Sequence, residues 1–122
     1  MKIDPFKISY PKQRIAEIKE KVEMFPWHEM PKEGGWSFGT NIDYMKNLAD
    51  YWTKKYDWES QEFRLNQQPN YITKVDDIDI HFIFKKSSSP KAIPLILIHG
   101  WPGSIVEFLE IIEPLCEPEK YG

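Results

Sequence analysis

Residues 94–104 read PLILIHGWPGS, and they are the most informative stretch of the chain. The run from 94 to 98 is apolar without alternation, which is typical of a strand that is covered on both faces in a parallel sheet. Two glycines and a proline lie within residues 99–103, so the chain is predicted to turn sharply there. Apolar side chains at helical spacing then predict a helix over about 104–115. A buried strand, a turn and a helix make up half of a βαβ crossover and indicate an α/β fold.

The segment before this unit is predicted to form an antiparallel hairpin. Residues 71–75 have the composition of a strand, and Asp76-Asp77 provides a turn. Apolar and polar side chains alternate from Ile78 to Lys85, as they do in a strand with one buried face. A serine-rich loop at 87–90 then leads to the buried strand.

The first 68 residues are predicted to be mainly helical. Apolar residues at spacings of three and four predict one helix over about 11–24, a second from Asn41 to about Asp57, and a third over about 58–67. Prolines, glycines and tryptophans alternate between 26 and 40, which predicts an irregular meander pressed against an apolar surface. We therefore expect two parts, a helical region over 1–68 and the start of an α/β core over 69–122.

Composition excludes several functional classes. The 122 residues carry 16 Lys and Arg against 19 Asp and Glu, so a net charge of −3 gives no electrostatic reason to expect nucleic-acid or anionic-membrane binding. The longest aliphatic run, 95–98, is far shorter than the roughly 20 apolar residues of a membrane span. The N-terminus has no apolar signal segment, and Cys116 is the only cysteine, which agrees with a reducing compartment. We expect a cytoplasmic protein.

The turn after the buried strand is the candidate site. Gly100 and Gly103 remove side chains that would keep a ligand from the backbone, and Pro102 is able to hold a cis bond. Such a bend, flanked by His99, would aim the Trp101 N–H outward as a donor to a developing oxyanion. A tight turn that serves packing alone is the other interpretation, and the residues leave both open.

Other chemistry-bearing residues give weaker signals. His28, His81 and His99 lack the spacing of metal ligands, and His99 has no neighbouring nucleophile to serve as a general base. We interpret Cys116 as a packed apolar residue. Glutamates at 107, 110 and 113 are interpreted as a solvated helix face. We expect no metal and no organic cofactor.

The chain resembles the N-terminal region of microsomal-type epoxide hydrolases of the α/β-hydrolase superfamily. The turn sequence LILIHGWPGS at 95–104 resembles their oxyanion-hole strand and turn. Further similar segments follow the family's order: FPW at 25–27, GW at 35–36, YMKNL at 44–48, YW at 51–52, YDW at 56–58, QEFRLN at 61–66 and IHFI at 80–83. The resemblance covers about residues 4–120.

The resemblance implies a fold, a substrate and a division of roles. The fold would be an incomplete α/β-hydrolase fold: a helical meander, a hairpin and the first buried strand-turn-helix. In this family an Asp attacks an epoxide to form an alkyl-enzyme ester, a His-activated water hydrolyses the ester to a vicinal diol, and cap tyrosines protonate the epoxide oxygen. Trp101 would supply an oxyanion-hole N–H, and His99, Gly100, Pro102 and Gly103 would shape the turn.

The remaining catalytic groups of the family have no counterpart in this sequence. None of the six glycines begins a G-x-D-x-G elbow, so the Asp nucleophile is missing, together with the His base and the cap tyrosines. We therefore expect an N-terminal part that is inactive without a C-terminal hydrolase portion. Two alternatives stay open: a non-catalytic interaction module that binds another chain by strand addition, and a truncated product with no function of its own. An unpartnered strand at 94–98 also predicts that the isolated chain aggregates.

Overall fold

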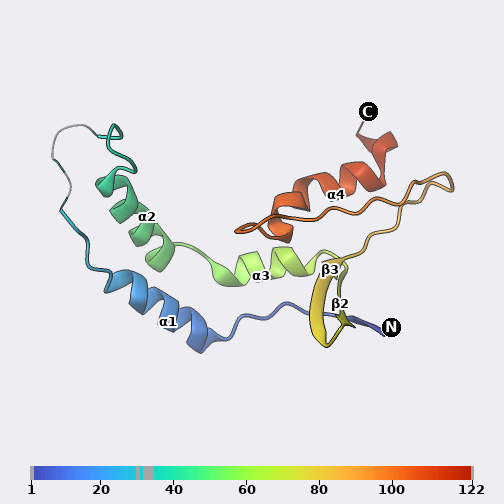
Figure 1. Cartoon of the computed structure of the whole chain (residues 1–122), viewed down its shortest axis with the longest axis horizontal. Coiled ribbons are helices and arrows are strands. Elements are labelled where there is room, and N and C mark those ends of the chain that lie inside the picture. The colour runs from blue at the N-terminus through green and yellow to red at the C-terminus, as the bar shows by residue number, and fades with distance from the viewer. Residues whose placement is uncertain (1, 30, 32–34, 122) are drawn as a thin grey trace. The chain divides into compact units, whose positions relative to one another are not determined.

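The computed structural model describes residues 2–29, 31 and 35–121, so residues 30 and 32–34 of the predicted meander lie outside the described residues. Its elements follow the order β1-α1-α2-α3-β2-β3-η1-α4-η2, where η denotes a 3₁₀-helix (Figure 1). Contacts divide the chain into two compact units, Ser9–Gln61 and Met1–Ile8 with Glu62–Gly122. Each unit is described separately below.

The unit Ser9–Gln61 contains α1 (Lys12–Glu23) and α2 (Ile42–Lys54), which pack against each other. The helix predicted over 11–24 is confirmed as α1. The predicted N-cap at Asn41 is also confirmed, because Asn41 Oδ1 accepts the Tyr44 N–H at 3.0 Å. α2 ends three residues before the predicted limit. Asp57 instead begins α3 (Trp58–Asn66), where its Oδ1 accepts the Ser60 N–H at 3.1 Å.

An aromatic cluster forms around the first turn of α3. The ring centroid of Trp58 lies 5.2 Å from that of Tyr56, 6.0 Å from that of Tyr10 and 6.1 Å from that of Trp52. Pairs at these separations stabilise a fold beyond the area they bury. These contacts join the segment before α1, the end of α2 and the start of α3 through aromatic side chains, of which Tyr10 and Trp52 stay partly exposed.

The other unit holds a three-stranded antiparallel sheet in the order β1-β2-β3. β2 (Asn70–Val75) and β3 (Ile78–Ile83) form the predicted hairpin, with Tyr71 opposite Phe82. Asp76 and Asp77 have φ of 47° and 64°, which gives the two-residue turn the left-handed conformation that favours Asp, Asn and Gly.

The edge strand β1 (Ile3–Pro5) has no counterpart in the sequence prediction. It is only three residues long and includes a proline, so no alternation of apolar and polar residues predicts it. It forms because β2 supplies partners: the Phe6 N–H donates to Asn70 O at 2.9 Å, and Thr73 Oγ1 donates to Lys2 O at 2.8 Å.

Two asparagines join α3 to this sheet and to the N-terminal segment. Asn66 Nδ2 donates to Ile8 O at 2.8 Å, and Asn66 Oδ1 accepts the Ile8 N–H at 2.9 Å. Asn70 Nδ2 donates to Leu65 O at 2.9 Å and to Gln68 O at 2.8 Å. Because amide side chains carry both donors and an acceptor, Asn66 satisfies both backbone groups of Ile8, and Asn70 holds the end of α3 to β2.

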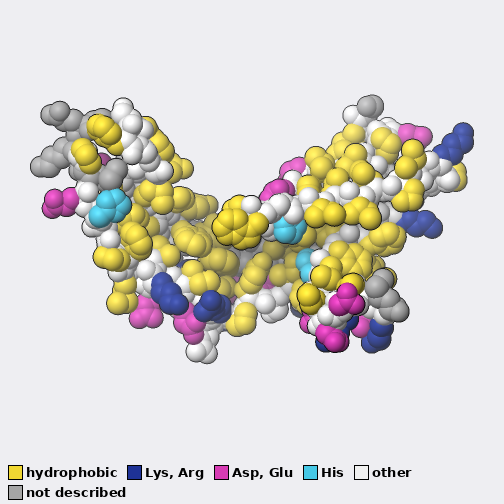
Figure 2. All heavy atoms as spheres, in the orientation of Figure 1, with side chains coloured by type: hydrophobic (Ala, Val, Ile, Leu, Met, Phe, Trp, Pro, Cys, Tyr) yellow, Lys and Arg dark blue, Asp and Glu magenta, His cyan; other side chains and the backbone are white. Residues whose placement is uncertain are grey.

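The segment 94–98 is neither paired nor covered among the residues that the structure describes, although the sequence predicts a strand covered on both faces. Within the described residues it takes part in no ladder, and Ile96 and Ile98 are 82% and 85% exposed. A strand requires hydrogen-bonding neighbours on its edges, and none of β1, β2 and β3 pairs with this one. Figure 2 shows hydrophobic side chains across much of the visible surface.

The helix predicted over 104–115 is divided into two parts. The 3₁₀-helix η1 (Ile105–Phe108) leads into α4 (Leu109–Cys116), and a short 3₁₀-helix η2 (Pro118–Lys120) follows. A 3₁₀ turn at the start of an α-helix is common, because it tightens the turn that leaves a cap.

Candidate functional site

The sequence HGWPGS forms the predicted sharp turn. The Gly103 N–H donates to Gly100 O at 2.7 Å, which closes a four-residue turn over 100–103. The Trp101–Pro102 peptide bond within it is cis. The structure thus brings Gly100, Trp101, Pro102 and Gly103 into one compact bend.

The backbone N–H of Trp101 is available to a ligand. It donates to no acceptor within the part of the chain that the structure describes. The Trp101 side chain is 97% exposed, so it does not cover the bend. His99 lies at the entrance to the turn, with its Nδ1 3.2 Å from Gly100 O. The site thus presents one preorganised backbone donor, the kind of group that stabilises an oxyanion.

The two glycines of the turn have different surroundings. A Cβ at Gly103 would lie 2.9 Å from Gly100 O and would overlap the carboxylate of Glu107. A Cβ at Gly100 would meet nothing within 4 Å. A side chain at Gly103 would therefore displace the Glu107 carboxylate and crowd Gly100 O, whereas no described residue fills the space beside Gly100.

A capping box follows directly after the turn. Ser104 Oγ accepts the Val106 N–H at 3.3 Å, and Glu107 Oε1 accepts the Ser104 N–H at 3.2 Å. The interpretation of Glu107 as part of a solvated face missed this contact. The pattern S-x-x-E at 104–107 is the signal that would have revealed it.

The two acidic residues of α4, Glu110 and Glu113, also make specific contacts. Glu110 forms an ion pair with Arg64, and Glu113 forms one with Lys85. Following α4, Glu117 Oε2 accepts the Ser88 hydroxyl proton at 2.7 Å, and its Oε1 accepts the Ser88 N–H at 3.0 Å. These hydrogen bonds lower the pKa of Glu117. The face therefore attaches α4 to α3 and to the loop after β3.

The three histidines are not brought together with other ligating side chains in the described part of the chain. Across 2–29, 31 and 35–121, no three His, Cys, Asp or Glu side chains are grouped to hold an ion. His81 Nε2 lies 3.0 Å from Asn70 Oδ1, and burial lowers the pKa of His81. Both Asn70 Nδ2 protons are already donated, so Asn70 Oδ1 accepts and His81 carries its proton on Nε2. Cys116 is half-buried, with Sγ 3.6 Å from Lys85 O.

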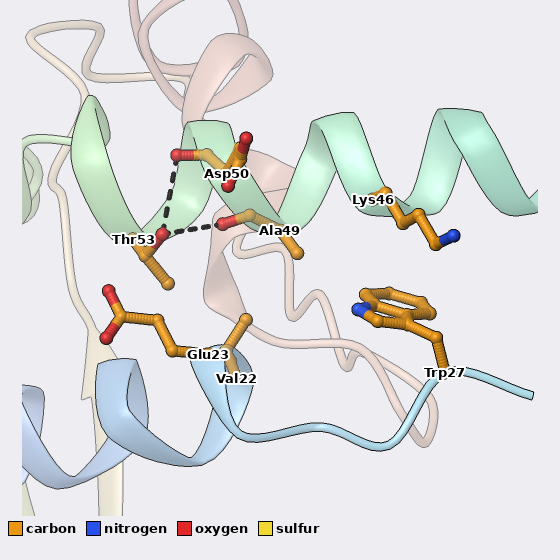
Figure 3. Close-up of a pocket in the computed structure, with 7 residues that line it drawn as sticks. All are labelled: Val22, Glu23, Trp27, Lys46, Ala49, Asp50 and Thr53. Atoms are coloured by element: carbon orange, nitrogen blue, oxygen red, sulfur yellow. Dashed lines mark hydrogen bonds between the residues drawn. The ribbon is translucent and has the colours of Figure 1, made fainter.

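Two hollows lie against α1 and α2, and no sequence pattern predicts either. The larger, about 540 Å³, is lined mainly by apolar residues, including Phe25, Trp27 and Trp52. The smaller, about 240 Å³, is bordered by Glu23 and Asp50 (Figure 3). The Thr53 hydroxyl donates its proton to Ala49 O at 2.9 Å, so its hydrogen bond is made within α2.

Comparison with known proteins identifies the family. A sequence model of the family described as "Epoxide hydrolase N terminus" matches residues 3–108, which is most of the chain. The chain belongs to this family. As an epoxide hydrolase N-terminal domain it is 35% identical to epoxide hydrolase 1 of Sus scrofa, over 98% of this chain and 27% of that protein. It is 38% identical to juvenile hormone epoxide hydrolase 1 of Ctenocephalides felis, over 95% of this chain and 26% of that protein.

Solved structures agree with this assignment. The epoxide hydrolase of Aspergillus niger superimposes on 93% of the domain with a TM-score of 0.84 and 30% identity, and the match covers 30% of that chain. The predicted fold class, part of an α/β-hydrolase fold, is confirmed by this neighbour. The domain spans about 27% of the length of the curated relatives it matches. None of the helices among its described residues is long and apolar enough to cross a membrane.

Proposed function

We propose that this domain contributes the oxyanion-hole turn of an epoxide hydrolase that converts epoxides to vicinal diols. The observation that carries the proposal is the Trp101 N–H, which has no acceptor within the described part of a chain of this family. Hydrolysis of an alkyl-enzyme ester passes through a tetrahedral oxyanion. A backbone N–H held in position stabilises that charge without reorganising during the reaction.

The surrounding residues would hold this donor in place. Pro102 and Gly103 form the second half of the bend, His99 precedes it, and Gly100 leaves its open side accessible. In this proposal residues 69–122 begin the α/β core and residues 1–68 form a helical extension. The Asp nucleophile, the His base and the cap tyrosines would come from a C-terminal hydrolase portion, and the reaction would need only water and no cofactor.

A chimera tests the activity. These 122 residues would replace the matching segment of the Aspergillus niger enzyme, whose structure guides the junction. We expect the chimera to form diol from an epoxide such as styrene oxide, and the 122 residues alone to form none. A folded chimera without turnover would contradict the proposal, as would turnover by the 122 residues alone.

The role of the backbone donor is tested by replacing one atom. Incorporating the α-hydroxy analogue of tryptophan at position 101 of the chimera turns the N–H into an ester oxygen. Losing one oxyanion-hole donor is expected to lower kcat by about 10²- to 10³-fold. Trp101→Phe keeps the N–H and serves as the control, with kcat close to that of the parent. An ester variant as fast as the parent would remove Trp101 from the oxyanion hole.

A second candidate function rests on the exposed segment 93–98. Ile93, Ile96 and Ile98 are each more than 80% exposed, and the segment joins no ladder within the described residues. Such a segment is suited to a non-catalytic interaction module that binds another chain by strand addition. A stable monomer that binds no separately expressed C-terminal hydrolase portion in size-exclusion chromatography would exclude this function.

A further inference from the structure

We infer that Glu107 is a positioning residue for the oxyanion-hole turn, a role that rests on the function proposed above. Its carboxylate contacts the turn from the helix side. Glu107 Oε1 accepts the Ser104 N–H at 3.2 Å, and the same carboxylate occupies the space where a Cβ at residue 103 would stand.

This contact is transmitted to the donor through the backbone. Glu107 holds Ser104 and packs over Gly103, and the Gly103 N–H in turn holds Gly100 O at 2.7 Å. Trp101 lies between these two bonded glycines. Any rotation of the peptide plane that carries the Trp101 N–H must therefore move atoms that Glu107 constrains.

The helix side of this contact is itself held. The Glu107 N–H donates to Ser104 O at 3.1 Å, which fixes the start of η1. One turn further on, Glu110 is paired with Arg64 and Glu113 with Lys85, so α4 is attached to its unit. Glu107 is thus the link between an anchored helix and the turn that precedes it.

Charge and geometry make opposite predictions for Glu107. A negative carboxylate near a developing oxyanion would oppose its formation, so a role that depended on charge would be inhibitory. A role in positioning depends only on the oxygen that accepts the Ser104 N–H. Glu107→Gln keeps such an oxygen and removes the charge, whereas Glu107→Ala removes both.

Kinetics of the chimera separate these roles. A misplaced donor costs turnover rather than binding, so we expect Glu107→Ala to lower kcat by about 10- to 100-fold with KM within about twofold. Glu107→Gln should keep kcat within about threefold of the parent. Glu119→Ala removes the same charge at an exposed position of η2 and should leave both constants within about twofold. Equal losses in the Ala and Gln variants, or an unchanged Ala variant, would overturn the inference.

Amide hydrogen exchange of the 122 residues provides a readout that does not need activity. The Ser104 N–H should exchange about tenfold faster in Glu107→Ala than in the parent and at a near-parental rate in Glu107→Gln, and the Trp101 amide resonance should shift only in Glu107→Ala. If the chimera forms no diol, the proposed function fails while these exchange rates still decide whether Glu107 holds the turn. Unchanged exchange at Ser104 in Glu107→Ala would contradict the inference.

Discussion

Replacing Asn70 by alanine should destabilise the unit that carries the candidate site. Asn70 is only 5% exposed and makes three hydrogen bonds: to Leu65 O at 2.9 Å, to Gln68 O at 2.8 Å, and with His81 Nε2 at 3.0 Å. At roughly 1 kcal/mol for each hydrogen bond, their loss should lower the free energy of unfolding by about 3 kcal/mol. That is a large share of the stability of a small domain.

Urea denaturation monitored by tryptophan fluorescence measures this effect. A low protein concentration keeps self-association of the chain weakest. Asn47→Ala is the matched control, because Asn47 is exposed on α2, and it should change the free energy of unfolding by less than about 0.5 kcal/mol. Asn70→Asp keeps the acceptor for His81 but turns the donors to Leu65 and Gln68 into acceptors, so it should destabilise at least as much as alanine. A loss below about 1 kcal/mol in Asn70→Ala would refute the reasoning that these bonds join α3 to the sheet.

Three further outcomes follow from the same contacts. Burial holds the pKa of His81 below its ordinary value of 6.5, so neutral His81 contributes fully to stability above pH 6.5. This contribution is lost as the pH falls from 6.5 toward the lowered pKa. Urea unfolding at a series of pH values should show the free energy of unfolding decreasing over this range, and His81→Gln should reduce that decrease. Gly103→Ala should lower the free energy of unfolding by about 1 kcal/mol or more, because its Cβ displaces the Glu107 cap. Gly100→Ala should change it by less than about 0.5 kcal/mol in the same urea assay. Equal effects of the two substitutions would contradict the difference in space at the two glycines. Ile96→Lys should reduce self-association of the 122 residues in sedimentation velocity, and a parent that sediments as a monomer under the same conditions would be inconsistent with this.

Local patterns predicted the elements whose determinants lie within a few residues of one another. The hairpin of β2 and β3 follows from alternation on either side of Asp76-Asp77, and α2 begins at the predicted Asn41 cap. The bend at 99–103 follows from its glycines and proline. In each case the responsible side chains act on backbone that is adjacent in the sequence, so the pattern and the physical cause coincide.

Contacts between distant residues escaped prediction. β1 depends on the hydrogen bond that Thr73 donates to Lys2 O and on the one that the Phe6 N–H donates to Asn70 O, and no periodicity in three residues indicates them. The spacing of Glu107, Glu110 and Glu113 predicts a solvated face and does not reveal that Arg64, 46 residues before Glu110, lies opposite that residue. The Glu107 contact differs, because its S-x-x-E signal lies within four consecutive residues of the sequence.

Residues 94–104 illustrate the same division within one segment. Their composition is sufficient for an extended apolar run that ends in a rigid bend, because glycine, proline and β-branched residues restrict the backbone locally. Whether the run is paired and covered depends on strands elsewhere, and only the folded arrangement reveals that β1, β2 and β3 leave it exposed. Likewise, the free Trp101 N–H and the Glu107 contact are properties of three-dimensional distances, since a hydrogen bond forms only where donor and acceptor meet in space.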